Sequence, residues 1–510
     1  MEHSTKIKLF EILSKYNNDY FNSLYNNTIK IDKNNSKLIS LNKKPIKNLN
    51  KLKPFEFWDY IDKPKYVCAP MVDHSELSFR LITRKYGVKL AYTPMIHSVV
   101  FTTNDKYQKQ WMNDILYSSE IEAGATFMQF CGHDPEILLK AAKLVEGKVE
   151  GIDLNLGCPQ GIAKRGNYGA YLLDNTDLVL KIVGYLSNNL TDSALTVKIR
   201  LFPELNNTFE LVNKLIDRGI KVLAVHGRTK EEKGQFVKEC NFNAIKDVRN
   251  VAKDVPFISN GGIETFDEVQ KCFDYTGCDA VMSSEGLLEY PALFYNYKQD
   301  INKNDICITD CDIEIIKNKL SNDYKQSKEE LSITTSLPKL NAINENTNIY
   351  TSNDDVDLSE DIEKIESNKI NKQSITYTKV LNIDNIAIEF IEISRILKND
   401  LDSVRSHLFK FMYRALQDNP ELNQKLAKTT SYEGFYKFVD NVRKSRIQMT
   451  NERKLGWYRR YRLIDRQGES IVKDTTNKKK PKLNNVLENK GVFDKHSNDN
   501  VEDILGMFDN

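Results

Sequence analysis

The chain has 510 residues, 40% hydrophobic and 28% charged, which is an ordinary globular composition with room for roughly two to four domains. Its net charge of +2 excludes a uniformly basic protein that coats nucleic acid, but it allows a local basic face. The N-terminus lacks a signal-peptide pattern, and no stretch approaches the roughly 20 apolar residues of a membrane span, so we expect no membrane partner.

The first segment, residues 1–60, is rich in Asn and Lys. A short helix is predicted near Ile7 to Tyr20. The rest of the segment has too few apolar residues to form a core, so we predict a poorly ordered N-terminal extension.

Residues 64–298 alternate between short β-type runs and helical patterns. The eight predicted strands are Tyr66–Ala69, Leu90–Thr93, Phe127–Phe130, Gly151–Asn155, Leu195–Ile199, Val222–Val225, Phe257–Ser259 and Ala280–Ser283. The predicted helices with clear start or stop residues are Ser75–Tyr86, one capped by Asp134-Pro135, Thr208–Arg218 and Thr265–Tyr275. This order predicts an α/β fold, a (β/α)8 TIM barrel. A doubly wound open sheet is the alternative, but no GxGxxG follows the first strand.

Three segments follow the predicted barrel. Residues 300–378 are polar and are predicted to be a disordered insertion. A helical period returns over 383–445 and predicts a small all-α domain, while 446–510 form a basic and then polar tail. The stretch Arg443–Arg466 has nine Lys or Arg against two acids with interleaved aromatic residues, which fits either an RNA contact or a solvated helix face. The run KKKPK is either a nuclear signal or a charged tail.

Polar or flexible residues stand at nearly every predicted strand end, where TIM barrels carry their active sites. They are Pro70 and Met71, Gln129 and Cys131, Asp153 to Gln160, Lys198 and Arg200, His226 to Thr229, Asn260 to Gly262, and Ser284 to Gly286. Any one of them alone could simply satisfy a buried polar network. Together they favour an active site, because a packed barrel interior needs aliphatic layers.

The loops after the seventh and eighth strands of such barrels often bind phosphate through backbone N–H groups. Asn260-Gly261-Gly262 allows a close backbone approach because glycine has no Cβ. Lys198 and His226 can add charge and hydrogen bonds. These features predict a phosphorylated cofactor without identifying it.

Cys158 lies after the fourth strand, between Gly157 and Pro159. Its thiol can donate a proton or, if its pKa is lowered, attack as a thiolate, and the sequence leaves both roles open. The eight cysteines include no CxxC pair, so we expect no metal site and no disulfide framework. Reduced thiols predict an intracellular location, cytoplasmic or nuclear.

The motifs APMVDHSELSFR, DLNLGCPQ, AKRG, VHGRT, SNGGI and SSEGLLEYPALF resemble those of the tRNA dihydrouridine synthases. Within that family, the resemblance is strongest to the eukaryotic subgroup that acts at positions 16/17 of the D-loop. It covers Lys65 to Tyr297 and resumes over Ile391 to Val442.

The resemblance implies an oxidoreductase that uses NADPH or NADH to reduce FMN, passes a hydride to C6 of uracil in tRNA, and protonates C5 from Cys158. The implied FMN-binding residues are Pro70, Met71, Val72, Gln129, Lys198, His226, Asn260, Gly261, Gly262, Ser284 and Glu285. The implied substrate-binding residues are Asn155, Arg165 and Arg200. The target base must be extruded to be reduced, and the helical domain would hold the tRNA. We expect a monomer.

Ser284-Glu285 departs from the Gly-Arg that many relatives carry, and places a carboxylate next to the expected phosphate. Three other readings stay open. The chain could be a different FMN barrel acting on free dihydropyrimidines, an inactive barrel kept as an RNA-binding module, or an aldolase that forms a Schiff base on Lys198.

Overall fold

The computed structural model describes residues 3–14, 30–32, 37–39, 44–295 and 383–446. The chain divides into two compact units, Met1–Phe294 with Ala387–Asn510, and Tyr295–Ile386. The predicted insertion 300–378 and tail 446–510 lie outside the described residues, apart from residue 446 itself, as does most of the basic stretch Arg443–Arg466. No helix in the described ranges is long and apolar enough to cross a membrane.

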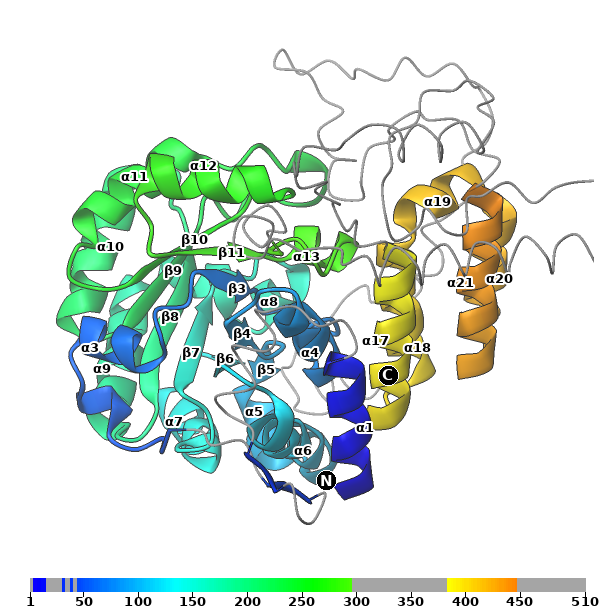
Figure 1. The fold of residues 1–510 in the computed structure, drawn as a ribbon. Coiled ribbons are helices and arrows are strands. Elements are labelled where there is room, and N and C mark those ends of the chain that lie inside the picture. Colours follow the sequence, from blue (N-terminus) through cyan, green and yellow to red (C-terminus); the bar gives the residue numbers. More distant parts are fainter. Residues whose placement is uncertain (1–2, 15–29, 33–36, 40–43, 296–382, 447–510) are drawn as a thin grey trace, which may run out of the picture. The chain divides into compact units, whose positions relative to one another are not determined.

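Eight parallel strands form a closed barrel (Figure 1). They are β3 (Tyr66–Cys68), β4 (Leu90–Tyr92), β6 (Ala125–Cys131), β7 (Gly151–Leu156), β8 (Ala194–Arg200), β9 (Val222–His226), β10 (Phe257–Asn260) and β11 (Ala280–Ser283). Each strand pairs with the next, β11 pairs with β3, and pairing of β4 with β6 closes the ring. The two-residue β5 (Ile96–His97) adds to β6. The predicted TIM barrel and its eight strands are confirmed.

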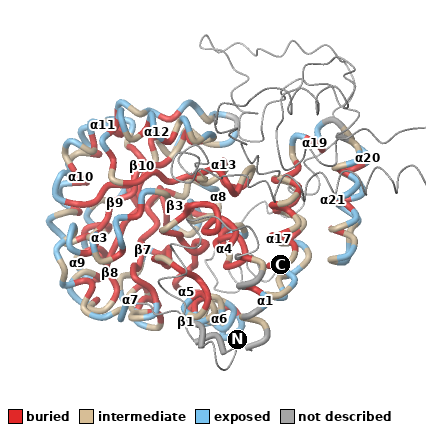
Figure 2. The backbone as a smooth tube through the Cα atoms, viewed as in Figure 1, coloured by how far each residue is buried: buried red, intermediate tan, exposed pale blue. Residues whose placement is uncertain are grey.

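Helices surround the strands, and burial separates the two layers (Figure 2). The longer ones are α4 (Leu77–Lys85), α6 (Asp105–Ile121), α7 (Pro135–Val145), α9 (Thr176–Asn189), α10 (Leu205–Asp217), α11 (Phe242–Val251) and α12 (Phe266–Thr276). Short α5 (Ser98–Thr103), α8 (Gly161–Arg165), α13 (Glu285–Glu289), η2 (Gly169–Asp174) and η3 (Gly234–Phe236) lie in the connections. The Asp134 carboxylate caps α7 by accepting from the N–H groups of Glu136 and Ile137, with Pro135 in the first turn, as predicted.

The N-terminal end of the barrel is closed by residues that were expected to be loosely ordered. In η1 (Leu49–Lys51) and α3 (Pro54–Tyr60), Leu49, Phe57 and Trp58 are buried among residues from the first halves of the strands. Upstream, α1 (His3–Ser14) and the paired β1 (Lys30–Asp32) and β2 (Lys37–Ile39) are also present. The prediction for 1–60 is therefore wrong over 44–60, because apolar side chains pack on the strands and the buried Asn50 side chain hydrogen-bonds to Ser187, Leu190 and Leu195.

The predicted helical segment contains α17 (Ile383–Leu397), α18 (Leu401–Phe411), α19 (Tyr413–Asp418), α20 (Pro420–Ala427) and α21 (Tyr432–Arg446). Polar contacts join it to α4. Glu389 pairs with Lys85 at 2.8 Å and accepts from the Tyr86 hydroxyl at 2.8 Å, and all three side chains are buried. A buried ion pair is costly to break, so these helices are held firmly against the barrel.

Candidate active site

A ladder of buried polar side chains crosses the barrel interior on β6, β7 and β8. Gln129 donates to the Asp153 carboxylate at 2.8 Å and accepts from the Asn155 amide at 2.7 Å. Thr196 donates to the second oxygen of Asp153 at 2.7 Å. Burial raises the pKa of Asp153 to about 6, although both hydrogen bonds favour its charged form. The ladder fixes three adjacent strands beneath the loop that carries Cys158.

Backbone contacts hold the Cys158 loop in place. The Asn155 side-chain oxygen accepts from the N–H groups of Gly157 and Cys158 at 3.0 and 2.9 Å. Arg200 donates to the Gly157 carbonyl at 2.8 Å, and the Ala170 N–H donates to the Cys158 carbonyl at 3.0 Å. Asn155 and Arg200, expected to contact substrate, therefore also position the thiol. Such support from two strands is what a reactive group needs to keep one geometry.

The charges around Cys158 suit a proton donor. Burial raises the pKa of the Cys158 thiol above its ordinary value, so the thiol is protonated at neutral pH. Arg200, Lys198 and Lys233 act in the opposite direction and favour the thiolate that remains after proton loss. Burial, aided by Arg200, lowers the pKa of Lys198 to about 8. Of the two roles that the sequence left open, this environment favours the proton donor.

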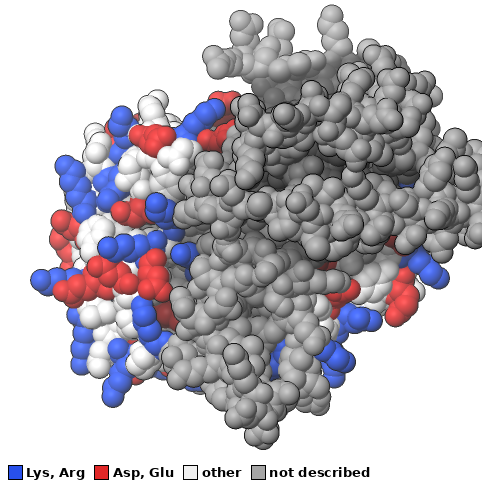
Figure 3. Space-filling model, in the orientation of Figure 1, with Lys and Arg blue, Asp and Glu red and all other residues white. Residues whose placement is uncertain are grey.

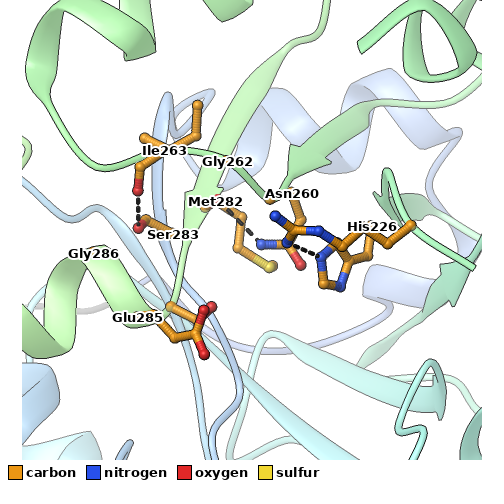
Figure 4. Close-up of a pocket in the computed structure, with 11 residues that line it drawn as sticks. His226, Asn260, Gly262, Ile263, Met282, Ser283, Glu285 and Gly286 are labelled. Carbon is orange, nitrogen blue, oxygen red and sulfur yellow. Dashed lines mark hydrogen bonds between the residues drawn. The ribbon is translucent and has the colours of Figure 1, made fainter. Parts of the chain in front are cut away.

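A small open pocket lies at the ends of β9, β10 and β11 (Figure 4). It is lined by His226, Arg228, Asn260, Gly261, Gly262, Ile263, Met282, Ser283, Ser284, Glu285 and Gly286. Gly261 and Gly262 have φ of +109° and +72°, which side chains rarely adopt. A Cβ on Gly261 would also lie 2.8 Å from the His226 ring. The predicted Asn260 to Gly262 turn thus has the backbone that only glycine allows.

Arg228 belongs to the predicted strand-end set His226 to Thr229 but not to the implied cofactor-binding residues, and the structure places it in the pocket. It is 4% exposed, and its guanidinium lies 3.1 Å from His226 Nε2. Burial and the nearby cations Arg200, Lys198 and Arg228 lower the pKa of His226 well below its ordinary value, so the ring is neutral. The VHGRT motif contained Arg228, but its position two residues past the strand gave no sign that it turns back into the pocket.

The pocket fits a phosphate-bearing ligand. Arg228 supplies a fixed positive charge, and the strained glycine turn leaves backbone accessible at the same place. Lys198 is 8% exposed, and no described residue accepts a hydrogen bond from its ammonium, so a ligand group is its natural partner. Glu285 lies on α13 at the opposite side of the pocket from His226 and Asn260 (Figure 4).

The predicted residues fall into two groups in the structure. His226, Asn260, Gly261, Gly262, Ser284 and Glu285 line the pocket, while Gln129, Lys198, Asn155 and Arg200 belong to β6 to β8. Pro70, Met71 and Val72 follow β3 and do not line this pocket; the Met71 N–H donates to the Ser75 hydroxyl at 3.0 Å. Arg165 is exposed at the end of α8. Among described residues, no group of three His, Cys, Asp or Glu is placed to hold a metal.

The closed (β/α)8 barrel, with a glycine-rich pocket and a thiol on a nearby loop, places the protein in the class of TIM barrels whose candidate active site lies at the strand ends. The sequence matches the family described as "Dihydrouridine synthase (Dus)" over residues 67–381, and the chain belongs to this family. Among solved structures, a 2-naphthoyl-CoA reductase complex matches with a TM-score of 0.37 and 8% identity, over 47% of this chain and 50% of that chain.

Curated relatives extend the family match. The Saccharomyces cerevisiae protein named tRNA-dihydrouridine(16/17) synthase [NAD(P)(+)] is 42% identical over 260 residues, 51% of this chain and 60% of that protein. A Mus musculus protein with the same name ending in "-like" is 43% identical over 246 residues, 48% of this chain and 50% of that protein. A second mouse protein, named for positions 20a/20b, is 36% identical over 46% of this chain and 70% of its own length. The chain thus spans 50 to 60% of the first two relatives.

Proposed function

We propose that this protein reduces uridine to 5,6-dihydrouridine in the D-loop of tRNA, at positions 16/17, with FMN as cofactor and NADPH or NADH as electron donor. Membership of the family and the names of the relatives support the reaction. The observation that carries the proposal is the buried Cys158 thiol, on a loop held by hydrogen bonds from Asn155 and Arg200, at the same barrel mouth as a pocket suited to phosphate.

The proposed proton donor is Cys158. When bound and reduced, FMN would supply the hydride for C6 of the base, and loss of the C5=C6 double bond would then require a proton at C5. Cys158 donates that proton and becomes a thiolate, which Arg200 and Lys198 stabilise until solvent restores the thiol. Asn155 and Arg200 hold the loop while the proton moves, because they bind backbone atoms of Gly157 and Cys158.

The proposed cofactor residues have different roles according to their positions in the barrel mouth. Arg228 and the N–H groups of the glycine turn would hold the phosphate, and Lys198 would hydrogen-bond to the flavin ring system deeper in the mouth. The full proposed set is Pro70, Met71, Val72, Gln129, Lys198, His226, Arg228, Asn260, Gly261, Gly262, Ser284 and Glu285. The buried Gln129 is fixed by Asp153 and Asn155, so it offers a preset amide to its ligand.

A folded tRNA is far larger than the barrel mouth, so contacts outside the mouth are needed. We assign them to exposed Arg165 and to the helical segment 383–445, with the adjoining basic stretch Arg443–Arg466. Figure 3 shows Lys and Arg interspersed with Asp and Glu over the visible described face of the barrel, without a field of one sign. Individual basic residues at particular positions, rather than a uniformly basic surface, would then guide the RNA.

The first test is the visible absorption spectrum of the purified full chain, before and after NADPH is added without oxygen. We expect a flavin spectrum that bleaches, followed by dihydrouridine formation when unmodified tRNA is added. A colourless protein that FMN cannot reconstitute would contradict the enzyme and favour an RNA-binding barrel. A bleaching flavin that reduces free pyrimidines but not tRNA would favour a different FMN barrel.

The helical segment can be tested separately. Deleting it would expose Lys85, which is buried against Glu389, so charge reversal on exposed residues is cleaner than truncation. Lys425→Glu with Lys428→Glu, both exposed at α20, should weaken tRNA binding severalfold in a filter-binding assay. Lys181→Glu with Lys253→Glu, exposed on the outer barrel wall, is the matched control and should leave the affinity unchanged.

A further inference from the structure

The loop after β9 reaches across the barrel mouth to the segment that carries Cys158. The Lys233 ammonium donates to the Pro159 carbonyl oxygen and, at 2.7 Å, to the Tyr171 hydroxyl. Tyr171 in turn donates to the same Pro159 carbonyl at 3.0 Å. The residue directly after Cys158 is thus held by two donors that come from two other parts of the chain, the loop after β9 and η2.

The partners of this contact are themselves fixed. The ammonium groups of Lys230 and Lys233 lie 5.6 and 5.3 Å from the centre of the Tyr171 ring, within cation–π range. Lys230 also forms an ion pair with Asp174 at the end of η2. All of these side chains except Asp174 are at least partly buried, so the contacts are shielded from full solvent screening. Lys230 lies on the same loop as Lys233 and also contacts the Tyr171 ring, but it does not form a hydrogen bond with Pro159.

We propose that Lys233 and Tyr171 are positioning residues for the Cys158 thiol, and that the loop after β9 thereby controls proton donation to the base. The proposal deepens the function proposed above and rests on it. Lys233 touches neither the proposed cofactor pocket nor, in the described structure, the thiol sulfur by a hydrogen bond. It acts through the Pro159 carbonyl and through its charge.

The charge of Lys233 favours loss of the proton from Cys158. Titratable and charged groups near the thiol come from each neighbouring element: Cys131 on β6, Tyr168 after the loop, Lys198 and Arg200 on β8, and Lys233 after β9. Lys233 is the member of this set that comes from a long surface loop. Because Lys198 and Arg200 lie on a buried strand, the loop supplies the cation that can be removed with least disturbance to the barrel.

The expected effects separate the two halves of the reaction. Lys233→Met removes the charge and the bond to Pro159, so Cys158 becomes a weaker acid on a looser loop. Base reduction should slow by roughly threefold or more, since general acid catalysis depends on the pKa of the donor. Flavin content and flavin reduction by NADPH should stay at the wild-type level, because Lys233 does not line the pocket.

The decisive readout is the pH profile of Cys158 alkylation by iodoacetamide, measured on the full chain by mass spectrometry of the Cys158 peptide. Lys233→Met should raise the apparent pKa of Cys158 by about half a unit or more. Lys233→Arg should restore the pKa, because it keeps the charge. Tyr171→Phe should leave the pKa near wild type but raise the maximal alkylation rate, because the hydroxyl's hydrogen bonds with Pro159 and Lys233 are lost while the charge of Lys233 remains. Lys230→Met is the matched control and should change neither quantity.

An unchanged Cys158 profile in a folded Lys233→Met protein would overturn the proposal, even if tRNA reduction fell, because Lys233 would then act on the RNA. The same shift in Lys230→Met would also overturn it, since any nearby cation would suffice. If the wild-type protein binds no flavin and yet the shift appears with Lys233→Met alone, the positioning role stands and the proposed enzyme function fails.

Discussion

The two sides of the barrel mouth are built on different physical principles. On the side of β6 to β8, polar side chains bind one another: Gln129, Asp153 and Asn155 form a closed ladder under the Cys158 loop. On the side of β9 to β11, two glycines at positive φ line a small open pocket beside Arg228. The Gln129, Asp153 and Asn155 side chains satisfy one another, whereas the second side offers an open pocket.

The difference assigns a separate task to each side. The proposed proton donor must be held in one place and kept protonated, and the ladder and the burial of Cys158 suit that proposed task. A cofactor must be admitted and then held through its phosphate, which an open pocket with a fixed cation achieves. If this division is correct, damage to one side should leave the task of the other side intact, and each of the variants below tests that independence.

The largest effect is expected from Cys158→Ala. Loss of a general acid typically costs about 100-fold to 10,000-fold in rate, so dihydrouridine formation should fall by at least about 100-fold. Flavin content and its bleaching by NADPH should be unchanged, as measured by absorbance and stopped-flow. Cys240→Ala, which removes a buried thiol next to the glycine turn, is the reciprocal control and should disturb flavin binding more than turnover. Loss of flavin in Cys158→Ala would break the division.

The pocket side is tested by Gly261→Ala. The φ of +109° and a Cβ only 2.8 Å from the His226 ring should together cost about 1–3 kcal/mol, and flavin affinity should fall by roughly 10-fold to 100-fold. The alkylation profile of Cys158 should not change. Gly277→Ala, with φ of +64° and open space around it at the end of α12, controls for backbone strain and should retain wild-type flavin affinity, measured by fluorescence titration.

Most of the fold could be predicted from the sequence because the barrel strands are continuous buried runs between glycines and caps. The Asp134-Pro135 start of α7 was found from local capping chemistry alone. Residues 44–60 were misjudged because Phe57 and Trp58 stand in a polar segment, and burial of so few side chains leaves no period to detect. Local sequence patterns therefore predicted the repeating strands and helices. They did not predict residues 44–60, which close the barrel end through long-range packing.

The site was harder to predict because its geometry depends on contacts between distant loops. The polar residues at the predicted strand ends indicated Gln129, Lys198, His226 and the glycine turn as site candidates. The closed barrel places all of them at one mouth. It could not show that Arg228 turns back into the pocket. Nor could it show that Lys233 reaches Pro159, since 74 residues separate them along the chain. Such pairings follow from loop conformations that single-residue properties do not encode.

The two sides should also respond oppositely to pH. The pKa of Asp153 is raised to about 6 in the folded state, so its contribution to the free energy of unfolding is present below about pH 4 and lost as pH rises through 6. The pKa of His226 is lowered, so its contribution is present above about pH 6.5 and lost as pH falls below that value. In urea unfolding between pH 4 and 8, Asp153→Asn should remove a fall of about 1–3 kcal/mol in the free energy of unfolding with rising pH. His226→Gln should instead remove a rise in the free energy of unfolding with rising pH. Identical slopes in both variants would contradict the assignment.

The smallest effect, and the sharpest test of the pocket side, concerns Glu285. Its carboxylate lines the pocket that we assign to a phosphate, and like charges repel, so Glu285→Gln should tighten FMN binding by roughly twofold to threefold at low salt. The gain should shrink as salt is raised, because screening weakens repulsion between partly exposed charges. Glu289→Gln, four residues on and paired with Arg414 outside the pocket, should leave FMN affinity unchanged. Weaker binding by Glu285→Gln would contradict the repulsion and would mean that the carboxylate accepts a hydrogen bond from a hydroxyl of the ligand.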